Sequence, residues 1–196
     1  MGKEALVIIG AIASLIAIAG YIKDTIKGQT KPNRITWLMW AIAPMIAFSA
    51  SASEGLSWSL LPGFISGFGP LLVFMASFLN SKSYWQLKSF DYICGLLSLL
   101  ALILWAITKD INVAIFFSIL SDGLAAFPTL LKAKIAPQSE TASPFIVGMF
   151  SGLAGIIVAD QFIFSEVGFN FYLVIINILL SSTIILSKRA QNAGSK

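Results

Sequence analysis

One acidic side chain stands in the middle of a long apolar stretch of the sequence. Asp122, in Ser121-Asp122-Gly123, is preceded and followed mainly by Ile, Leu, Phe and Ala. An ionised carboxylate at the centre of a membrane helix costs about 2.5–3.5 kcal/mol on insertion scales, so such groups generally serve a function. We expect Asp122 either to bind a cationic group or to gain and lose a proton. The alternative is a protonated or paired Asp122 that fixes its helix to a neighbour.

Three other side chains are expected to form a binding site for a solute or a proton with Asp122. Asn177 falls at a similar depth in a later apolar stretch, so the two are expected near one another. The alternative for Asn177 is an interhelical hydrogen bond worth about 1 kcal/mol. Ser66 occupies this level of an earlier stretch. Trp40 lies further from the membrane surface than the other tryptophans, and it either flanks the inner end of a cavity or packs between helices.

Three prolines lie well inside apolar stretches, at Pro44, Pro70 and Pro128. A proline inside a helix removes one hydrogen-bond donor and displaces the carbonyl group four residues earlier. In a membrane, such a freed carbonyl is tolerated only where protein or a wet cavity surrounds it. We therefore expect these positions to be hinges, although proline is also common in membrane helices that do not move.

Other chemistry is excluded by residue types that the chain lacks or holds once. The sequence contains no His and a single Cys, Cys94, so we expect no metal site, disulfide or cofactor. A retinal pigment needs a Schiff-base lysine deep in a helix, and the last apolar stretch has none before Lys188. A single mid-membrane carboxylate without histidine also argues against an intramembrane protease. The sequence therefore predicts that the protein is not an enzyme.

Seven apolar segments carry these residues. The chain of 196 residues is 57% hydrophobic and 11% charged, with a mean hydropathy of +0.87, whereas soluble domains carry about 25% charged residues. The segments have about the length of a membrane-spanning helix, and they lack the alternation of barrel strands. The sequence predicts an all-α membrane protein with seven transmembrane helices at 5–22, 35–53, 59–79, 92–108, 113–131, 142–159 and 171–186.

Tryptophans and small residues indicate how these segments are placed. Four tryptophans fall near segment ends, where an indole keeps its N–H in the wet interface: Trp37, Trp58, Trp85 and Trp105. Four small residues recur at helical spacing in the sixth segment, and we expect them to form a ridge for close helix packing: Gly148, Ser151, Gly152 and Gly155.

Basic residues gather on one side of the expected membrane. With seven spans, the side with few basic residues holds only Lys3 and Lys109. The basic side holds Lys23, Lys27, Lys31, Arg34, Lys82, Lys88, Lys132, Lys134, Lys188, Arg189 and Lys196. Because cytoplasmic loops retain Lys and Arg, we expect a multi-pass protein of the cytoplasmic (inner) membrane with its N terminus outside and its C terminus cytoplasmic. Cleavage of the first segment would invert this pattern, so it is expected to remain as a span. The basic residues then face anionic lipids, and nucleic acid is excluded as a partner.

The sequence also contains an internal repeat. A shift of 105 residues brings Trp40 over Phe145 and pairs Lys27 with Lys132, Pro32 with Pro137, Thr36 with Thr141 and Gly63 with Gly168. Because three helices cross the membrane an odd number of times, one extra helix makes a second copy parallel to the first. This predicts a 3+1+3 parallel-repeat arrangement: a first three-helix bundle with its following loop (1–91), a linker helix (92–112), and a second three-helix bundle with a basic tail (113–196). The alternative is seven unrelated spans.

The stretch from Phe127-Pro128-Thr129 through Lys132 to Pro144 resembles the PQ-loop group of seven-helix transporters, which includes the SWEET sugar transporters and the cystinosin-like exporters. Members end the first helix of each repeat with Pro-Gln, followed by a short basic loop and a hydroxyl residue where the next helix begins. Here Thr129 replaces the glutamine, and the first repeat has Lys23-Asp24 at this place. The resemblance implies a transporter, and in SWEET-like members an asparagine at the depth of Asn177 contacts the substrate.

Together these features predict a secondary transporter that moves a small polar solute by alternating access between two three-helix bundles. Nicotinamide-riboside-type vitamin transporters have a similar plan and are an alternative. A seven-helix receptor and a structural membrane subunit without transport are two more. The expected partners are the solute, membrane lipids, and protons if Asp122 couples transport to them; a homo-oligomer is left open.

Overall fold

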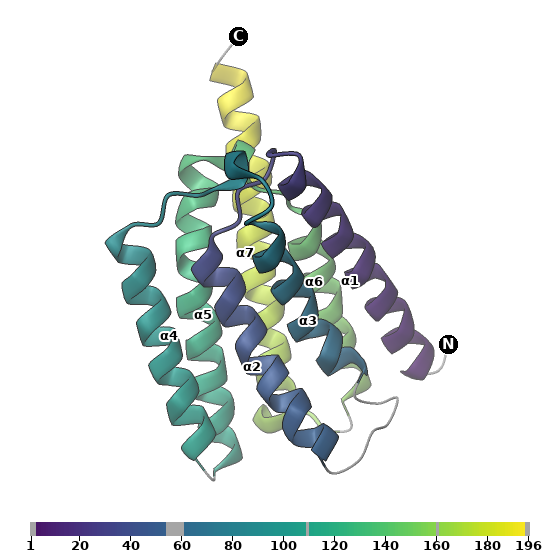
Figure 1. The fold of residues 1–196 in the computed structure, drawn as a ribbon. Helices are drawn as coiled ribbons and strands as arrows, with labels where there is room; N and C mark the ends of the chain where they lie inside the picture. Colours follow the sequence, from purple (N-terminus) through teal and green to yellow (C-terminus); the bar gives the residue numbers. More distant parts are fainter. Residues whose placement is uncertain (1–2, 54–60, 109, 160, 195–196) are drawn as a thin grey trace.

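The computed structural model describes residues 3–53, 61–108, 110–159 and 161–194, and their regular structure is helical. Two short 3-10 helices, η2 (Ser81–Ser83) and η3 (Pro137–Ser139), precede α4 and α6. The main elements lie side by side (Figure 1), and they are α1 (Lys3–Ile26), α2 (Arg34–Ser53), α3 (Leu61–Ala76), α4 (Ser89–Ile107), α5 (Ile111–Ile135), α6 (Ser143–Val158) and α7 (Phe164–Gly194). Each overlaps one expected segment, which confirms the all-helical class.

Four helices among the described residues are long and apolar enough to cross a membrane: α4, α5, α7 and the part Ile8–Ile26 of α1. Shorter apolar helices accompany them at Arg34–Ile46, Phe64–Ala76 and Ser143–Val158. The outward side chains of the long and short helices include Leu96 of α4, which is 68% exposed, and Ile157 of α6, which is 71% exposed. Water would solvate such a surface at a high free-energy cost, whereas lipid covers it readily. The chain is a helical membrane protein.

Helices α3 and α7 each pack against two other helices. Among α1–α3, α3 packs against both α1 and α2, and among α5–α7, α7 packs against both α5 and α6. The two groups meet where α1 packs on α6 and α2 packs on α5. Helix α4 packs mainly on α5 and also touches α2. Below, α1–α3 are called the first group and α5–α7 the second group.

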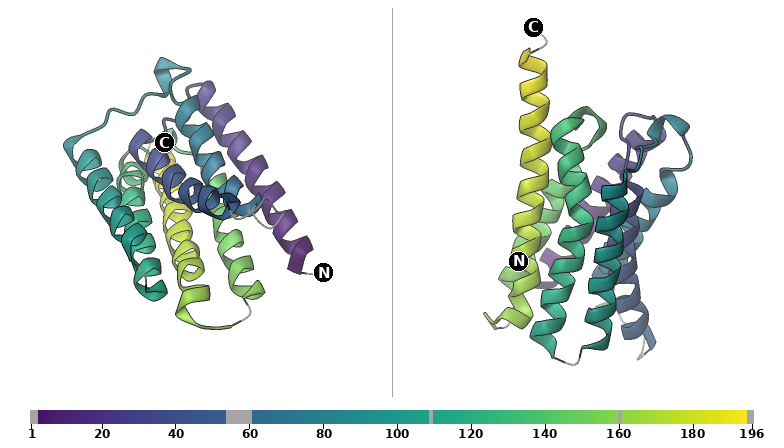
Figure 2. Two further views of the ribbon diagram at one scale, coloured as in Figure 1. Left: turned by 60° about the horizontal axis from the view of Figure 1, so that its bottom comes forward. Right: turned by 90° about the vertical axis from the view of Figure 1, so that its left-hand side faces the viewer.

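The two ends of the molecule differ in their connections (Figure 1). One end carries the α1–α2, α3–α4 and α5–α6 connections and the C terminus, and the chain begins at the opposite end. The first of these ends also holds the basic residues of those connections, so we call it the basic end. Helix α7 extends past its neighbours there (Figure 2), and its last turns include Lys188 and Arg189.

Local capping explains how the chain turns at the basic end. Helix α1 ends at Ile26, and Gly28 then adopts φ 77°, a left-handed conformation that glycine adopts without a Cβ penalty. The Asn33 side chain accepts hydrogen bonds from the backbone N–H groups of Ile35 (3.1 Å) and Thr36 (3.3 Å), which satisfies free donors of the first turn of α2. Its amide also donates to Asp91 Oδ1 at 2.9 Å, which ties the start of α2 to the start of α4.

Helices α6 and α7 pack closely because three glycines face α7. A Cβ atom added at Gly148 would lie 2.6 Å from Asn177 Oδ1, and one at Gly152 would lie 2.9 Å from the Asn170 carbonyl oxygen. One added at Gly155 would collide with the Asn170 side chain. The expected packing ridge is therefore confirmed at these three glycines.

The three expected hinge prolines lie inside helices. Pro44 is inside α2, Pro70 is inside α3 and Pro128 is inside α5. Each helix continues past its proline. Their role as hinges stays a prediction.

Candidate functional site

Asp122 lies at the meeting point of three helices. It is partly buried in the middle of α5, and the Tyr172 hydroxyl of α7 donates a hydrogen bond to Asp122 Oδ2 at 2.6 Å. The Trp40 indole of α2 lies beside the same carboxylate, and its buried Nε1 forms no hydrogen bond of normal geometry with the described residues. No Lys or Arg of the described residues pairs with Asp122. Neutral groups from both helix groups therefore surround a carboxylate that has no cationic partner.

Four aromatic side chains separate Asp122 from the basic end, and we call them the aromatic layer. They are Tyr21 of α1, Trp37 and Trp40 of α2, and Phe145 of α6. Ring centroids lie 4.7 Å apart for Tyr21 and Trp37, 5.4 Å for Trp37 and Trp40, and 6.1 Å for Trp40 and Phe145. Because both groups contribute rings, the layer fills the space between them with packed apolar surface.

A hydrogen-bonded seam joins the two groups between the aromatic layer and the basic end. The Thr129 hydroxyl of α5 donates to Thr36 Oγ1 of α2 at 3.0 Å, and Thr36 in turn donates to the Ala125 carbonyl at 2.7 Å. The Thr141 hydroxyl, before α6, donates to Asp24 Oδ2 of α1 at 2.8 Å. Thr30 Oγ1 lies 2.7 Å from Thr141 Oγ1. These side chains satisfy one another across the contact between α1, α2 and the second group.

The seam also contains a buried ion pair. Lys132 Nζ lies 2.5 Å from Glu140 Oε1, and the two side chains are 1% and 0% exposed. The Tyr21 hydroxyl donates to Glu140 Oε2 at 2.7 Å, and Lys132 Nζ donates to the Lys31 carbonyl. The Lys31 N–H donates to the Ser139 carbonyl at 2.9 Å. Charged groups at this depth are retained only with such a full set of partners.

The structure brings some of the expected site residues together and keeps others apart. Asp122 and Trp40 come together, whereas the hydrogen-bond partner of Asp122 on α7 is Tyr172 and not Asn177. Asn177 donates to the Leu173 carbonyl of its own helix at 2.8 Å and packs against Gly148 of α6. Five residues span about 140° around a helix, so positions 172 and 177 face different neighbours.

Ser66 and the tryptophans expected near the segment ends lie in different surroundings. Ser66 has an exposed side chain on α3, next to Gly67, which packs on Met45 of α2. Trp37 is 2% exposed and belongs to the aromatic layer, so the expectation that it anchors the protein at the membrane surface is wrong. The Trp85 ring lies 5.1 Å from Lys132 Nζ and covers the ion pair. Trp58 lies outside the described residues.

Sequence reasoning missed Tyr21, Tyr172 and Glu140. Each is a polar side chain within or beside an apolar segment, but none of them stands at the centre of a segment as Asp122 does. Lys132 was interpreted only as a charge of a cytoplasmic connection. A usable signal was present: a lysine and a glutamate eight residues apart, with the lysine directly after the predicted segment 113–131.

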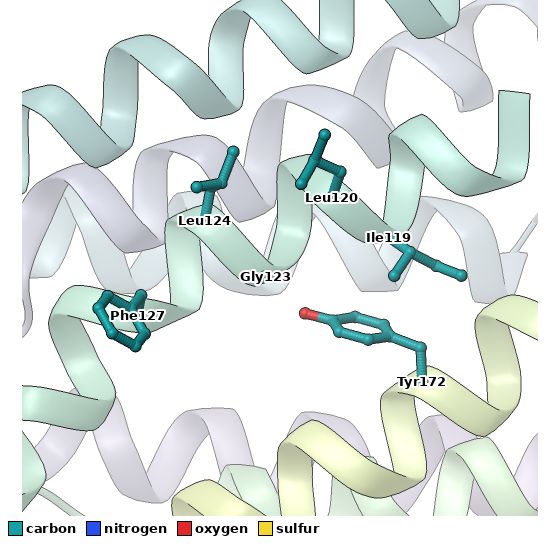
Figure 3. A pocket seen from close by; sticks show the side chains of 6 residues that line it. All are labelled: Ile119, Leu120, Gly123, Leu124, Phe127 and Tyr172. Atoms are coloured by element: carbon teal, nitrogen blue, oxygen red, sulfur yellow. The ribbon is translucent and has the colours of Figure 1, made fainter. Parts of the chain in front are cut away.

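An open apolar groove lies between Tyr172 of α7 and the surface of α5. It has a volume of about 450 Å³ and is lined by Ile119, Leu120, Gly123, Leu124, Phe127 and Tyr172 (Figure 3). The Tyr172 hydroxyl is directed at α5 beside Gly123, where a Cβ atom would lie 3.5 Å from it. Leu120 and Phe127 are exposed on the outer surface of α5, so this groove faces the surroundings of the protein.

Comparisons and metal-binding patterns add no further assignment. Within the described residues no group of three or more His, Cys, Asp or Glu side chains is placed to hold a metal ion. No family model, curated protein or solved structure matches the chain.

Proposed function

We propose that the protein is a secondary transporter of small polar solutes in which the two helix groups move against one another around Asp122. The observation that carries this proposal is a mid-helix carboxylate at the contact of α2, α5 and α7, with no cationic partner in the described part of the chain. Ionisable groups inside a membrane protein that face the contact between helix bundles serve substrate binding or proton relay by default. Asp122 is the group that binds a cationic part of the solute or carries a coupled proton.

The pattern of contacts between the groups supports a 3+1+3 repeat with seven spans and α4 as the linker. A shift of 105 residues converts the pair Thr36–Thr129 into the pair Thr141–Asp24, and both pairs are hydrogen-bonded, at 3.0 and 2.8 Å. The same shift converts Trp40 into Phe145, and these two rings are in contact. Residues that a two-fold axis relates can touch one another only near that axis. Parallel repeats related by such an axis along the membrane normal are a known transporter plan.

The distribution of charge supports an orientation with the basic end in the cytoplasm. Lys and Arg are concentrated in the connections at that end, and cytoplasmic loops of membrane proteins retain these residues. In this orientation the N terminus is outside, and the seam closes the cytoplasmic end of the path. The structure then corresponds to a state closed toward the cytoplasm.

The test of this function is solute-driven flux in proteoliposomes. A panel of sugars, amino acids and vitamins is assayed under an imposed proton gradient and in counterflow, with the unsubstituted protein and with Asp122→Asn. Asn keeps the size of the side chain but cannot ionise. We expect flux of at least one solute, at least a tenfold loss of its rate in Asp122→Asn, and an unchanged elution profile of the purified variant.

Asp110→Asn is the matched control, because Asp110 is an exposed N-cap at the start of the same helix. Asn is also a good N-cap, so this variant should fold and transport normally. Absence of flux for every panel member with the unsubstituted protein would contradict the transporter assignment. Normal flux in Asp122→Asn would contradict the role of the carboxylate.

A further inference from the structure

The buried ion pair of the seam lies entirely within the second group. Lys132 is in the last turns of α5, and Glu140 is in the connection that leads to α6. Lys188 of α7 also belongs to this group, and its Nζ donates to the Glu140 backbone carbonyl at 2.7 Å. The second group thus holds the pair in place with its own helices.

The first group approaches the ion pair only through neutral atoms in the contacts described. These are the Tyr21 hydroxyl, which binds Glu140 Oε2, and the Lys31 carbonyl, which binds Lys132 Nζ. The other contacts of the seam are also hydrogen bonds, among them Lys31 N–H to the Ser139 carbonyl and Thr30 to Thr141. A plane drawn between the two groups therefore crosses hydrogen bonds and leaves Lys132 and Glu140 on the same side.

Separation of the two groups at these hydrogen bonds costs much less free energy than separation of Lys132 from Glu140. Removing one partner of a buried ion pair leaves an uncompensated charge in a medium of low polarity. Water can replace a hydroxyl or a carbonyl group at once, because it both donates and accepts hydrogen bonds. Parting at the neutral contacts hydrates the pair while its two charges stay together.

We propose, building on the proposed transport function, that the seam is the gate of the basic end and that it opens between the Lys132–Glu140 pair and the groups Tyr21 and Lys31. The ion pair stays intact in the open and closed states of the gate. In the closed state the first group binds to it. The aromatic layer parts in the same movement, because Tyr21 belongs to both layers. The contacts that Tyr21 and Lys31 make with the pair, rather than the bond between Lys132 and Glu140, set how often the gate opens.

Hydrogen exchange of the Lys31 amide measures this opening directly, since its hydrogen bond crosses the plane of separation. Exchange is followed by mass spectrometry on the full chain in detergent, without solute. Tyr21→Phe keeps the ring and removes the hydroxyl that binds a charged group, so we expect exchange at Lys31 about tenfold faster. Tyr84→Phe is the control at the same end, because its side chain is 45% exposed, and it should leave exchange unchanged. Equal exchange in Tyr21→Phe and the unsubstituted protein would overturn the proposal.

Engineered disulfides locate the plane of opening. The double variant Thr30→Cys/Thr141→Cys replaces hydroxyl groups 2.7 Å apart across the seam, and oxidation should slow exchange at Lys31 at least tenfold relative to the reduced form. Ser98→Cys/Ser121→Cys replaces hydroxyl groups 3.0 Å apart between α4 and α5, and its oxidation should have no effect. Equal exchange in the oxidised and reduced forms of Thr30→Cys/Thr141→Cys would place the opening elsewhere and refute the proposal.

A double variant that removes both charges of the pair distinguishes a role in gating from a purely structural role. Lys132→Met/Glu140→Gln keeps the side-chain sizes and weakens both contacts to the first group, so exchange at Lys31 should rise at least tenfold. A pair that served only the fold would change the melting temperature and leave this exchange rate unaltered, which would overturn the proposal.

These measurements distinguish the gate from the transport function. A protein whose seam opens as described but that gives no flux for any solute would refute transport and leave the gate standing. A protein that transports while Tyr21→Phe leaves exchange unchanged would refute the gate and leave transport standing.

Discussion

At the scale of single residues, each of two inward-facing carboxylates is bound by a tyrosine hydroxyl. Tyr172 donates to Asp122 at 2.6 Å, and Tyr21 donates to Glu140 at 2.7 Å. The two sites differ in what completes them, because Glu140 has a lysine partner and Asp122 has none among the residues that the structure describes. A paired carboxylate keeps its charge compensated in every state, whereas an unpaired one can exchange a proton or a cation during function.

The ion pair provides a stability prediction at this scale. Lys132→Met alone leaves Glu140 charged and buried without its cation, and we expect it to lower the free energy of unfolding by about 3–5 kcal/mol. The double variant Lys132→Met/Glu140→Gln removes both charges and should recover at least half of this loss. Chemical unfolding in mixed micelles, followed by circular dichroism, measures both values. A double variant less stable than the single one would show that the charges themselves hold the fold.

At the scale of elements, contacts are set by glycines that let helices approach. Gly67 of α3 packs on Met45 of α2, Gly95 of α4 on Ile35 of α2, and the α6 glycines on α7. Without a hydrophobic force between helices in lipid, such close van der Waals packing is a main source of association. The glycines therefore allow close approach between α3 and α2, between α4 and α2, and between α6 and α7.

Gly152→Ala tests this packing. Its Cβ would lie 2.9 Å from the Asn170 carbonyl oxygen and 2.9 Å from Val174 Cγ2, so α6 and α7 must separate. Overpacking of this kind costs about 1–3 kcal/mol, and we expect a corresponding fall in the melting temperature of the purified protein. Gly20→Ala is the matched control in α1, where nothing lies within 4 Å of the added atom. It should be neutral or stabilising by about 0.5–1 kcal/mol, and a stable Gly152→Ala variant would argue against the ridge.

Sequence reasoning predicts the helices well and their faces poorly. Long apolar runs identify each helix because burial in lipid requires them, and the spacing of Gly148, Gly152 and Gly155 predicts a packing face. Trp37 was assigned to the membrane surface because a tryptophan near a helix end has the same sequence signature whether it faces lipid or protein. The partner of Asp122 was also out of reach, because the rotation of α7 that selects Tyr172 over Asn177 depends on packing against α6.

At the scale of the whole molecule, the connections with most of the basic residues share one end with the seam. The seam, the basic connections and the projecting end of α7 all lie there (Figure 1; Figure 2). If this end faces the cytoplasm, opening of the seam connects Asp122 with the cytoplasm.

Thiol labelling from outside the cell tests this orientation. Cysteines are introduced in the Cys94→Ala background at Gln161, an exposed residue at the end opposite the seam, and at Lys82, an exposed residue at the basic end. We expect an impermeant maleimide to label Gln161→Cys in intact cells at least tenfold more than Lys82→Cys. Permeabilised cells, in which both positions should react, are the control. The reverse pattern in intact cells would invert the assigned orientation.

The places of α3 and α7 in the sequence determine when during synthesis the helix contacts can form. In each group the helix that packs on both others is the last to be synthesised. Helices α1 and α2 are therefore synthesised before the helix that packs on both, and Thr36 of α2 precedes its partners Ala125 and Thr129 by about ninety residues of synthesis. During that interval the polar side of α2 has no protein partner in the second group. The hydrogen bonds that join α2 to α5 can therefore form only after α5 has been synthesised.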